Sequence, residues 1–294
     1  MSQTMAELPV VKATYNGKVR DIYDLGDTLL IVTSDRISAF DVVFPNPIPE
    51  KGKILNQISV FFFKATQDIV KNHFITDRVE EYPAEFLPFK SELEGRSMLV
   101  KKTRVIPFEC IVRGYISGSA WQEYQKFSTV SNMIMPDGLK ESQKFPNPLF
   151  TPSTKSSDGH DENISYHEML TRIDELIAEK LKDTSIALYK FAHDYLKEKD
   201  IILADTKFEF GTIGSEIYLI DEICTPDSSR FWDVQEYLVG TSPKSFDKQY
   251  LRDYVTSIGW DKEPPAPELP GEVVKATLEK YKEAYRRITG DNKF

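Results

Sequence analysis

Several familiar signatures are absent from this sequence. It has only two cysteines, Cys110 and Cys224, and each lies in a run of apolar or β-prone residues, so a disulfide framework is not expected. The four histidines fit neither an HExxH motif nor a Cys/His zinc spacing. Neither Gly-Lys pair belongs to a Walker A loop, and no GxGxxG occurs. A nucleotide would therefore need another arrangement.

Long hydrophobic runs and excess positive charge are also missing. No stretch approaches the roughly 18 apolar residues of a membrane span, and the N-terminal segment lacks the basic-then-apolar order of a signal peptide. The 294 residues carry a formal charge of −9, which disfavours nucleic acid and membranes as partners. We expect a soluble, cytoplasmic protein that would hold anionic ligands with local basic clusters or metal ions.

The order of the expected elements favours an α+β fold. Hydrophobic residues make up 40% of the 294, enough for a core, and the length suggests two lobes sharing a cleft. Strand-like segments dominate residues 10–106, and they and the helices are segregated rather than alternating. The other expected elements are a helix near 54–71, a strand at 108–114, a helix from about Ala120, a polar segment at 127–163, a helix capped by Ser165 and Glu168, a helix at 184–199, paired strands near 201–210 and 216–224, and a terminal helix at 272–289 after a proline-rich connector.

An unusual alternation occurs at residues 203–211, LADTKFEFG. Asp205, Lys207 and Glu209 occupy every second position, so in a strand they line one face, opposite mostly apolar groups. The common interpretation is the solvated face of an amphipathic strand. The alternative is a row of working groups, and other segments must decide between the two.

The segment NGKVRD at residues 16–21 opens a strand with a turn-prone Asn-Gly pair. It is expected to place Lys18 and Arg20 on the same strand face, where a glycine turn and a lysine suit phosphate. An ordinary turn with two solvated cations remains the alternative.

The segment IVRGYISGSAWQEY at residues 111–124 joins a strand to a helix. Ser119 and Gln122 predict a capping box, and a helix N-terminus offers N–H donors that suit a phosphate. Arg113 can add a bidentate contact. A plain strand-to-helix turn remains an equal alternative.

Residues 218–232, YLIDEICTPDSSRFW, follow the expected hairpin. If odd positions pair with odd positions, Asp221 lies beside or diagonal to Glu209. Two such carboxylates repel each other unless a cation lies between them, and Mg²⁺ with bridging phosphates is a frequent solution. Asp227 and Arg230 follow among several hydroxyl residues, which favours the working-group interpretation of residues 203–211.

The polar segment FTPSTKSSDGHDENIS at residues 150–165 contains Lys155 and Asp161. Its composition is typical of a solvated, partly disordered loop. The functional alternative is a flexible lid over a substrate.

These motifs together resemble one enzyme family. GKVRD, ECIVRGYISGSAW, FTPSTK…HDENIS, ADTKFEFG and DEICTPDSSRFW occur in the order found in phosphoribosylaminoimidazole-succinocarboxamide synthase (SAICAR synthetase), and the length resembles that of the longer, fungal-type single-function members. The resemblance implies a kinase-like, β-rich ATP-binding lobe at 1–107, and a larger α+β lobe at 108–294 with the substrate and magnesium sites and a terminal helix.

The same resemblance implies a reaction. The family joins L-aspartate to the carboxylate of carboxyaminoimidazole ribonucleotide (CAIR), forming SAICAR, ADP and phosphate, and an acyl phosphate is the expected intermediate. ATP and Mg²⁺ are the expected cofactors, and long members are expected to be monomers.

The resemblance also implies roles for individual residues. Residues expected near ATP are Gly17, Lys18, Val19, Arg20, Arg104, Ile106, Glu109 and Lys207. Residues expected to bind Mg²⁺ are Glu209 and Asp221, and those expected to bind CAIR are Arg113, Ser119 and Arg230. Asp205, Lys207 and Asp227 are expected at the reacting end, with Lys155 and Asp161 contacting aspartate or closing over the intermediate. The sequence does not assign a carboxylate partner to Lys18.

Two rival functions remain at this point. A small-molecule kinase on a related scaffold would use the same magnesium carboxylates, but it would not need an amine site. A non-catalytic nucleotide sensor would have no reason to carry Lys207 and Asp227.

Overall fold

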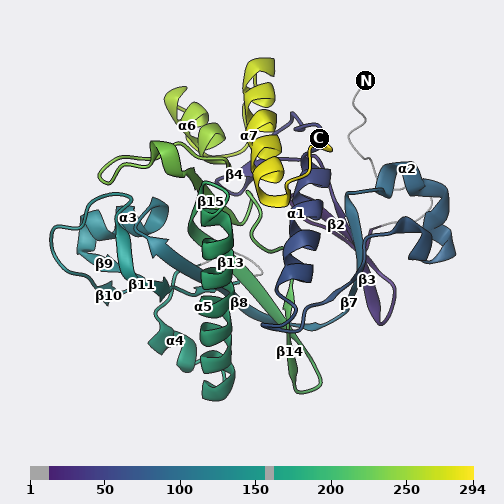
Figure 1. Cartoon of the computed structure of the whole chain (residues 1–294), viewed down its shortest axis with the longest axis horizontal. Coiled ribbons are helices and arrows are strands. Elements are labelled where there is room, and N and C mark those ends of the chain that lie inside the picture. The colour runs from purple at the N-terminus through teal and green to yellow at the C-terminus, as the bar shows by residue number, and fades with distance from the viewer. Residues whose placement is uncertain (1–12, 156–161) are drawn as a thin grey trace.

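The computed structural model describes residues 13–155 and 162–294, and its N-terminal part is a five-stranded antiparallel sheet, on the right in Figure 1. The strands in spatial order are β1 (Tyr15–Asn16), β2 (Arg20–Asp24), β3 (Thr28–Thr33), β7 (Ser97–Lys101) and β6 (Phe74–Thr76). These are the β-branched and aromatic segments from which strands were predicted.

The second sheet is built around two long antiparallel strands, β8 (Arg104–Tyr115) and β13 (Ile201–Ile213). The other strands are β11 (Lys144–Phe150) and β12 (Ser153–Thr154), which pair with β8, and β14 (Glu216–Ile220) and β15 (Ser229–Asp233), which pair with β13. The predicted hairpin is the β13–β14 pair. Two small pairs complete the described strands, β4 (Ser38–Ala39) with β5 (Val42–Val43) and β9 (Thr129–Val130) with β10 (Met133–Ile134).

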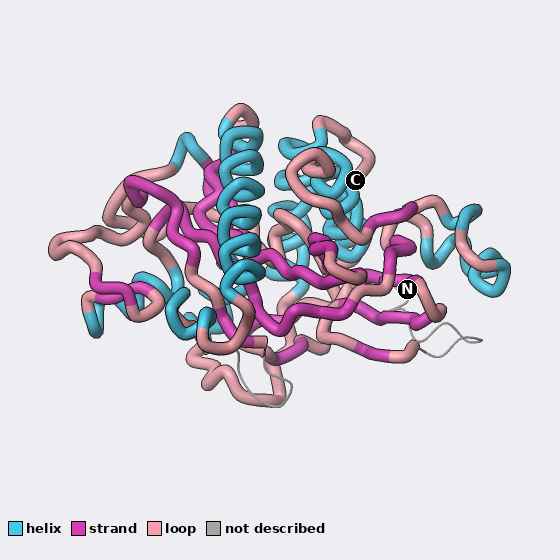
Figure 2. The backbone as a smooth tube through the Cα atoms, turned by 90° about the horizontal axis from the view of Figure 1, so that it is seen from below, coloured by secondary structure: helices cyan, strands magenta, loops and turns pink. Residues whose placement is uncertain are grey.

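Helices cover these sheets. The α-helices are α1 (Lys51–Ala65), α2 (Lys90–Leu93), α3 (Gly118–Phe127), α4 (Tyr166–Leu170), α5 (Glu175–Lys197), α6 (Gln249–Ser257) and α7 (Gly271–Thr289), and the 3₁₀ helices are η1 (Val79–Glu81), η2 (Ala84–Phe89) and η3 (Val234–Glu236). The long helix α5 packs against β13 and β8, while α7 lies beside α1 (Figures 1 and 2). None of the helices in the described ranges is both long and apolar enough for a membrane span.

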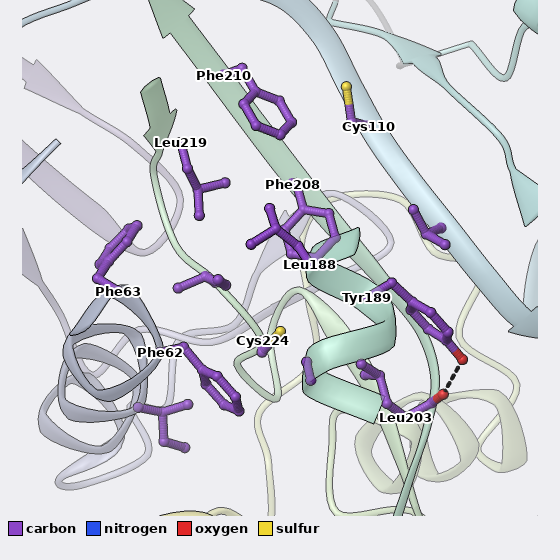
Figure 3. Close-up of a cluster of buried hydrophobic side chains, with 14 of the residues drawn as sticks. Phe62, Phe63, Cys110, Leu188, Tyr189, Leu203, Phe208, Phe210, Leu219 and Cys224 are labelled. Atoms are coloured by element: carbon purple, nitrogen blue, oxygen red, sulfur yellow. Dashed lines mark hydrogen bonds between the residues drawn. The ribbon is translucent and has the colours of Figure 1, made fainter. Parts of the chain in front are cut away.

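The apolar core is continuous across both sheets. Buried side chains from α1, β8, α5, β13 and α7 form one cluster, part of which Figure 3 shows. The Tyr189 hydroxyl donates a hydrogen bond to the Leu203 carbonyl at 2.6 Å. A Cβ on Gly114 would lie 1.9 Å from that hydroxyl, so only glycine permits this close packing. Cys110 and Cys224 are free and buried, as predicted.

Helices occur where they were predicted, but some of them begin or end at other residues than expected. The Ser165–Glu168 capping box is present, and α7 ends at Gly290 in a left-handed conformation with φ 72°. The helix predicted from Thr184 begins nine residues earlier, at Glu175, because Asp174 accepts hydrogen bonds from the N–H groups of the first turn. The helix predicted to reach residue 71 ends at Ala65.

The connection between the two sheets is short. β7 ends at Lys101 and β8 begins at Arg104, close to the predicted boundary at residue 107. The core nevertheless continues across this boundary, and α1 packs on α7 from the other end of the chain. We therefore propose that lobes 1–107 and 108–294 share one core.

Candidate active site

The centre of the candidate site is the ammonium group of Lys207 on β13. Its Nζ lies 2.5 Å from Glu209 Oε1, 3.1 Å from Glu109 Oε1 and 3.7 Å from Asp221 Oδ2. The register of β8 and β13 explains part of this grouping, because Glu109 and Glu209 are directly opposed and so share a sheet face. We call Lys207 and these three carboxylates the acid–base cluster.

The charges of this cluster are stabilised by one another. Burial alone would lower the pKa of Lys207, but Glu209, Asp221 and Glu109 outweigh it and raise that pKa well above its ordinary value. Burial alone would raise the pKa of Asp221, yet Arg20 and Lys207 hold it well below its usual range. Lys207 is therefore a cation, and its neighbour Asp221 an anion, near neutral pH.

Two further cations border the acid–base cluster. Arg20 Nη1 lies 2.8 Å from Asp221 Oδ1, and the same guanidinium forms an ion pair with Glu222. Lys155 forms an ion pair with Glu209, reached because β12 brings residue 154 alongside β8. Segments far apart in the sequence thus bring positively and negatively charged side chains together at the acid–base cluster.

The strand register predicted to bring Asp221 beside Glu209 was wrong, although both carboxylates do lie beside Lys207. Glu209 pairs with Ile220, so odd positions face even ones across the hairpin. β14 ends at Ile220, and Asp221 has a left-handed backbone with φ 67°. This break in the strand alternation places the Asp221 carboxylate beside Lys207.

A second charged group lies two residues before Lys207 on the same strand. Arg230 Nη1 donates to both oxygens of Asp205 at 2.9 and 2.8 Å, and Arg113 Nη1 lies 3.6 Å from Asp205 Oδ2. Burial tends to raise the pKa of Asp205, but Arg230 and Arg113 lower it overall. We call Arg113 and Arg230, with Asp205 between them, the arginine pair.

Ser119 joins the arginine pair but does not cap its helix. The N-cap is Ser117, whose side chain makes no capping hydrogen bond, so the predicted Ser119–Gln122 capping box was wrong. Ser119 lies inside α3 and its hydroxyl accepts from Arg113 Nη2 at 3.3 Å, while Ser117 Oγ donates to Asp205 at 3.2 Å. These serines support the arginine pair.

A cavity of about 140 Å³ opens beside the arginine pair. Its lining residues are Ser117, Gly118, Trp121, Gln122, Glu141, Ser142, Arg230, Trp232, Ser242, Pro243 and Gln249. Gly118 has φ 55°, and a Cβ there would lie 2.2 Å from Arg230 Nη2. Glycine is therefore required for Arg230 to reach the cavity wall.

The structure places Asp227 elsewhere than sequence reasoning expected. Its carboxylate is bound by Lys51 Nζ and Lys248 Nζ, each at 2.9 Å, and by the Tyr281 hydroxyl at 2.7 Å. No ion pair in the described part of the chain joins Asp227 to Lys207. The catalytic role predicted for Asp227 stays a prediction, and in this structure its carboxylate is held by groups from α1, α6 and α7.

The predicted ATP residues of the N-terminal lobe are divided between two environments. Lys18 precedes β2 and forms an exposed ion pair with Asp41. The prediction that Lys18 shares a strand face with Arg20 was therefore wrong. The Gly17 N–H donates to the Arg20 carbonyl at 2.7 Å, and the Val19 carbonyl accepts from the Ser34 N–H. Residues 17–20 therefore form a tight turn that ends at the acid–base cluster.

The predicted hinge residues lie at the start of β8. Arg104 is exposed and pairs with Thr212, whereas the Ile106 side chain is buried. The Lys155 N–H donates to the Pro107 carbonyl at 3.2 Å, so the segment carrying Lys155 lies against this hinge. Asp161 lies outside the described residues.

The charged and hydroxyl residues that sequence reasoning missed at these groups include Lys51, Glu222, Lys248 and Tyr281. Glu222 directly follows a predicted site residue, so its position was a usable signal. The other three come from the beginning of α1, the N-cap of α6 and the middle of α7, and no local pattern marks them.

Known proteins resemble this chain over almost its full length. Residues 13–267 match the SAICAR synthetase family. Enzymes named phosphoribosylaminoimidazole-succinocarboxamide synthase from Elusimicrobium minutum and Thermodesulfovibrio yellowstonii are 54% and 53% identical, covering 98% and 95% of this chain and 98% and 96% of their own.

Solved structures give the same result. SAICAR synthase from Saccharomyces cerevisiae, complexed with SAICAR, has a TM-score of 0.90 at 46% identity, and the match covers 99% of each chain. A SAICAR synthetase in complex with ADP has a TM-score of 0.70 at 29% identity, covering 94% of this chain and 97% of the other.

The α+β fold and these relatives define the protein as a ligase that uses ATP. The chain belongs to the SAICAR synthetase family. The predicted family and fold are thereby confirmed, and the kinase and sensor alternatives are not favoured.

Proposed function

We propose that the acid–base cluster and the arginine pair together catalyse the ATP-dependent ligation of L-aspartate to CAIR, giving SAICAR, ADP and phosphate for purine biosynthesis. The observation that carries this proposal is the position of Lys207. It is a cation among three carboxylates, and it lies on the same face of β13 as Asp205 and its two arginines. One strand thus aligns a group suited to phosphoryl transfer with a group suited to an anionic substrate.

The acid–base cluster is the proposed phosphate end of the ATP site. In this proposal the ATP phosphates lie along the turn at residues 17–20, which ends at the acid–base cluster. Lys18, Arg20 and Lys207 supply the positive charges that bind them. The backbone of Arg104 and Ile106 faces adenine in this proposal, and Glu109 reaches the ribose. The short connection between the sheets supports this arrangement, because β8 begins directly after the last strand of the N-terminal part, where the two sheets meet.

Glu209 and Asp221 are the proposed magnesium ligands. No three acidic, imidazole or thiol side chains form a ready metal site within residues 13–155 and 162–294. Two carboxylates are nevertheless the usual protein share of a Mg²⁺ site completed by phosphates and water, so the donor set fits. When bound, the ion would neutralise charge on the phosphates.

The arginine pair is the proposed binding site for the CAIR 5′-phosphate. Two guanidinium groups suit a phosphate dianion, and the neighbouring cavity provides space beside them. Ser119 adds a hydroxyl donor, and Asp205 holds both arginines in position. CAIR then extends from the arginine pair toward Lys207.

The chemistry follows from this alignment. A carboxylate is a poor electrophile, so an oxygen of the CAIR carboxylate first attacks the γ-phosphorus of ATP, and ADP leaves. The aspartate amine then attacks the acyl carbon of the mixed anhydride, losing a proton as phosphate leaves. Lys207 stabilises charge on the transferring phosphoryl group, and Lys155, with Asp161, contacts aspartate.

We also propose that the enzyme works as a monomer in the cytoplasm. Two buried, unpaired cysteines support a reducing compartment.

Phosphate release from Mg-ATP and CAIR, with and without L-aspartate, tests the proposal when combined with mass analysis of the product. The wild-type protein should release phosphate and form an aspartyl amide only when aspartate is present. Lys207→Ala should lower kcat by about 100-fold or more, because it removes a partly buried cation from the phosphoryl path. Lys71→Ala is the control, since it removes a lysine from an exposed ion pair with Glu216.

Three results would contradict this reading. Phosphate transfer to a stable product would indicate a kinase, and nucleotide binding without turnover would indicate a sensor. A folded Lys207→Ala variant with near-normal kcat would show that Lys207 does not act on the reaction.

A further inference from the structure

The C-terminal helix α7 carries a tyrosine whose hydroxyl reaches a buried carboxylate in the interior of the molecule. Tyr281 is fully buried, and its hydroxyl donates to Asp227 Oδ1 at 2.7 Å. Oδ2 of the same carboxylate is bound by Lys51 from the first turn of α1 and by Lys248 at the N-cap of α6. Three helices therefore converge on one aspartate.

This convergence is shielded from solvent. The side chains of Lys51 and Asp227 are 0% and 3% exposed. Burial lowers the pKa of Lys51 to about 8 even though Asp227 opposes the shift. Replacing a buried ion group by apolar residues is often neutral or stabilising, so stability alone is a weak reason for this arrangement. A requirement to hold Asp227 in one position is a stronger one.

Asp227 belongs to a tight turn at residues 225–228. Thr225 Oγ1 accepts from the N–H groups of Asp227 and Ser228 at 3.2 and 3.3 Å, and it donates to Glu222 Oε2 at 2.5 Å. Glu222 in turn forms an ion pair with Arg20. The turn is thereby connected to the acid–base cluster, because Arg20 also contacts Asp221.

The other side of the turn reaches Lys207 and the arginine pair. The Lys207 N–H donates to the Ser228 carbonyl at 3.0 Å, and β15 starts at Ser229, so Arg230 follows at once. A shift of Asp227 would therefore displace Lys207, Arg20 and Arg230 relative to one another.

We propose that Tyr281 is a positioning residue for the ligation, which fixes Asp227 and thereby sets the distance between the acid–base cluster and the arginine pair. This inference rests on the proposed function of those two groups. Helix α7 lies beyond residues 13–267, which match the family model, but within the span that the full-length relatives cover.

Tyr281→Phe tests this proposal, because it removes only the hydroxyl and keeps the ring that lies 5.8 Å from Lys51 Nζ. The matched control is Tyr285→Phe, since Tyr285 is a buried tyrosine one turn later on α7 whose hydroxyl donates to Asp291 instead. We expect kcat to fall about 10-fold in Tyr281→Phe, with KM for ATP changed less than about threefold. Tyr285→Phe should keep the wild-type kcat, and thermal unfolding should confirm that both variants are folded.

A second comparison uses Asp227→Asn. If Tyr281 acts through Asp227, adding Tyr281→Phe to Asp227→Asn should lower kcat by less than twofold further. Unchanged kcat in Tyr281→Phe, or equal losses in the two tyrosine variants, would overturn the proposal. The wild-type protein is assayed alongside: its failure to form SAICAR would overturn the proposed function and this inference with it, whereas an active wild type with an unaffected Tyr281→Phe would overturn the inference alone.

Discussion

His73 is a buried imidazole between α1 and β6. Its side chain packs against Phe63 with ring centroids 5.1 Å apart, and its Nε2 has no hydrogen-bond partner among the described residues. Burial lowers its pKa from 6.5 to about 3. Folding therefore requires a neutral ring at this position.

The pH dependence of stability follows from that shift. Between about pH 3 and 6.5 the unfolded chain binds a proton on His73 that the folded protein excludes, so stability falls as pH falls through this window. When pH is lowered from 7 to 4.5, the free energy of unfolding should fall in both proteins. The fall should be about 2 to 3 kcal/mol smaller in His73→Leu than in the wild type. Urea unfolding at both pH values measures the difference.

The comparison has an internal control. Between pH 7 and 8 the ring is largely neutral in both states, so variant and wild type should respond to pH alike. Equal losses at pH 4.5 in the two proteins would show that His73 is not responsible.

At the scale of the element, α5 begins where one side chain satisfies its first turn. Asp174 Oδ1 accepts from the N–H groups of Leu176 and Ile177 at 3.0 and 3.2 Å. The sequence prediction began at Thr184 and missed this cap. The first turns of α5 carry several exposed polar residues, which dilutes the apolar periodicity.

Asp174→Ala should lower the free energy of unfolding by about 1 kcal/mol, because it leaves two N–H groups without their acceptor. The value of kcat should not change. Lys180→Ala, an exposed replacement within α5, is the control for alanine in the helix. A stability equal to that of the control would show that the cap contributes nothing measurable.

At the scale of the whole molecule, one core connects the two sheets. Because α1, β8, α5 and α7 share buried contacts, neither lobe can unfold without exposing apolar surface of the other. Calorimetry should therefore show a single transition with equal calorimetric and van't Hoff enthalpies. Its midpoint should be independent of protein concentration if the enzyme is a monomer, and sedimentation velocity at micromolar concentration should show one species of monomer mass.

Two resolved transitions would contradict the shared core and favour independent lobes. A midpoint that rises with concentration, or a stable dimer in sedimentation, would contradict the monomer.

The sequence by itself determined most of the elements and the identity of the family. Alternation and β-branched composition located the main strands, capping residues located α4 and the end of α7, and five ordered motifs indicated the SAICAR synthetase family. These signals are local, because strand period, helix caps and motif order depend on residues close together in the chain.

Tertiary structure alone decided how the charged residues meet. The face of β13 that carries Asp205 and Glu209 is buried rather than solvated, since the partners of these carboxylates come from β8, β15 and the segment after β12. Asp221 reaches the cluster because its own backbone is left-handed, a conformation that strand alternation does not predict. Lys51 and Asp227 are 176 residues apart in the chain, and only the packing of α1, α6 and α7 brings such residues together.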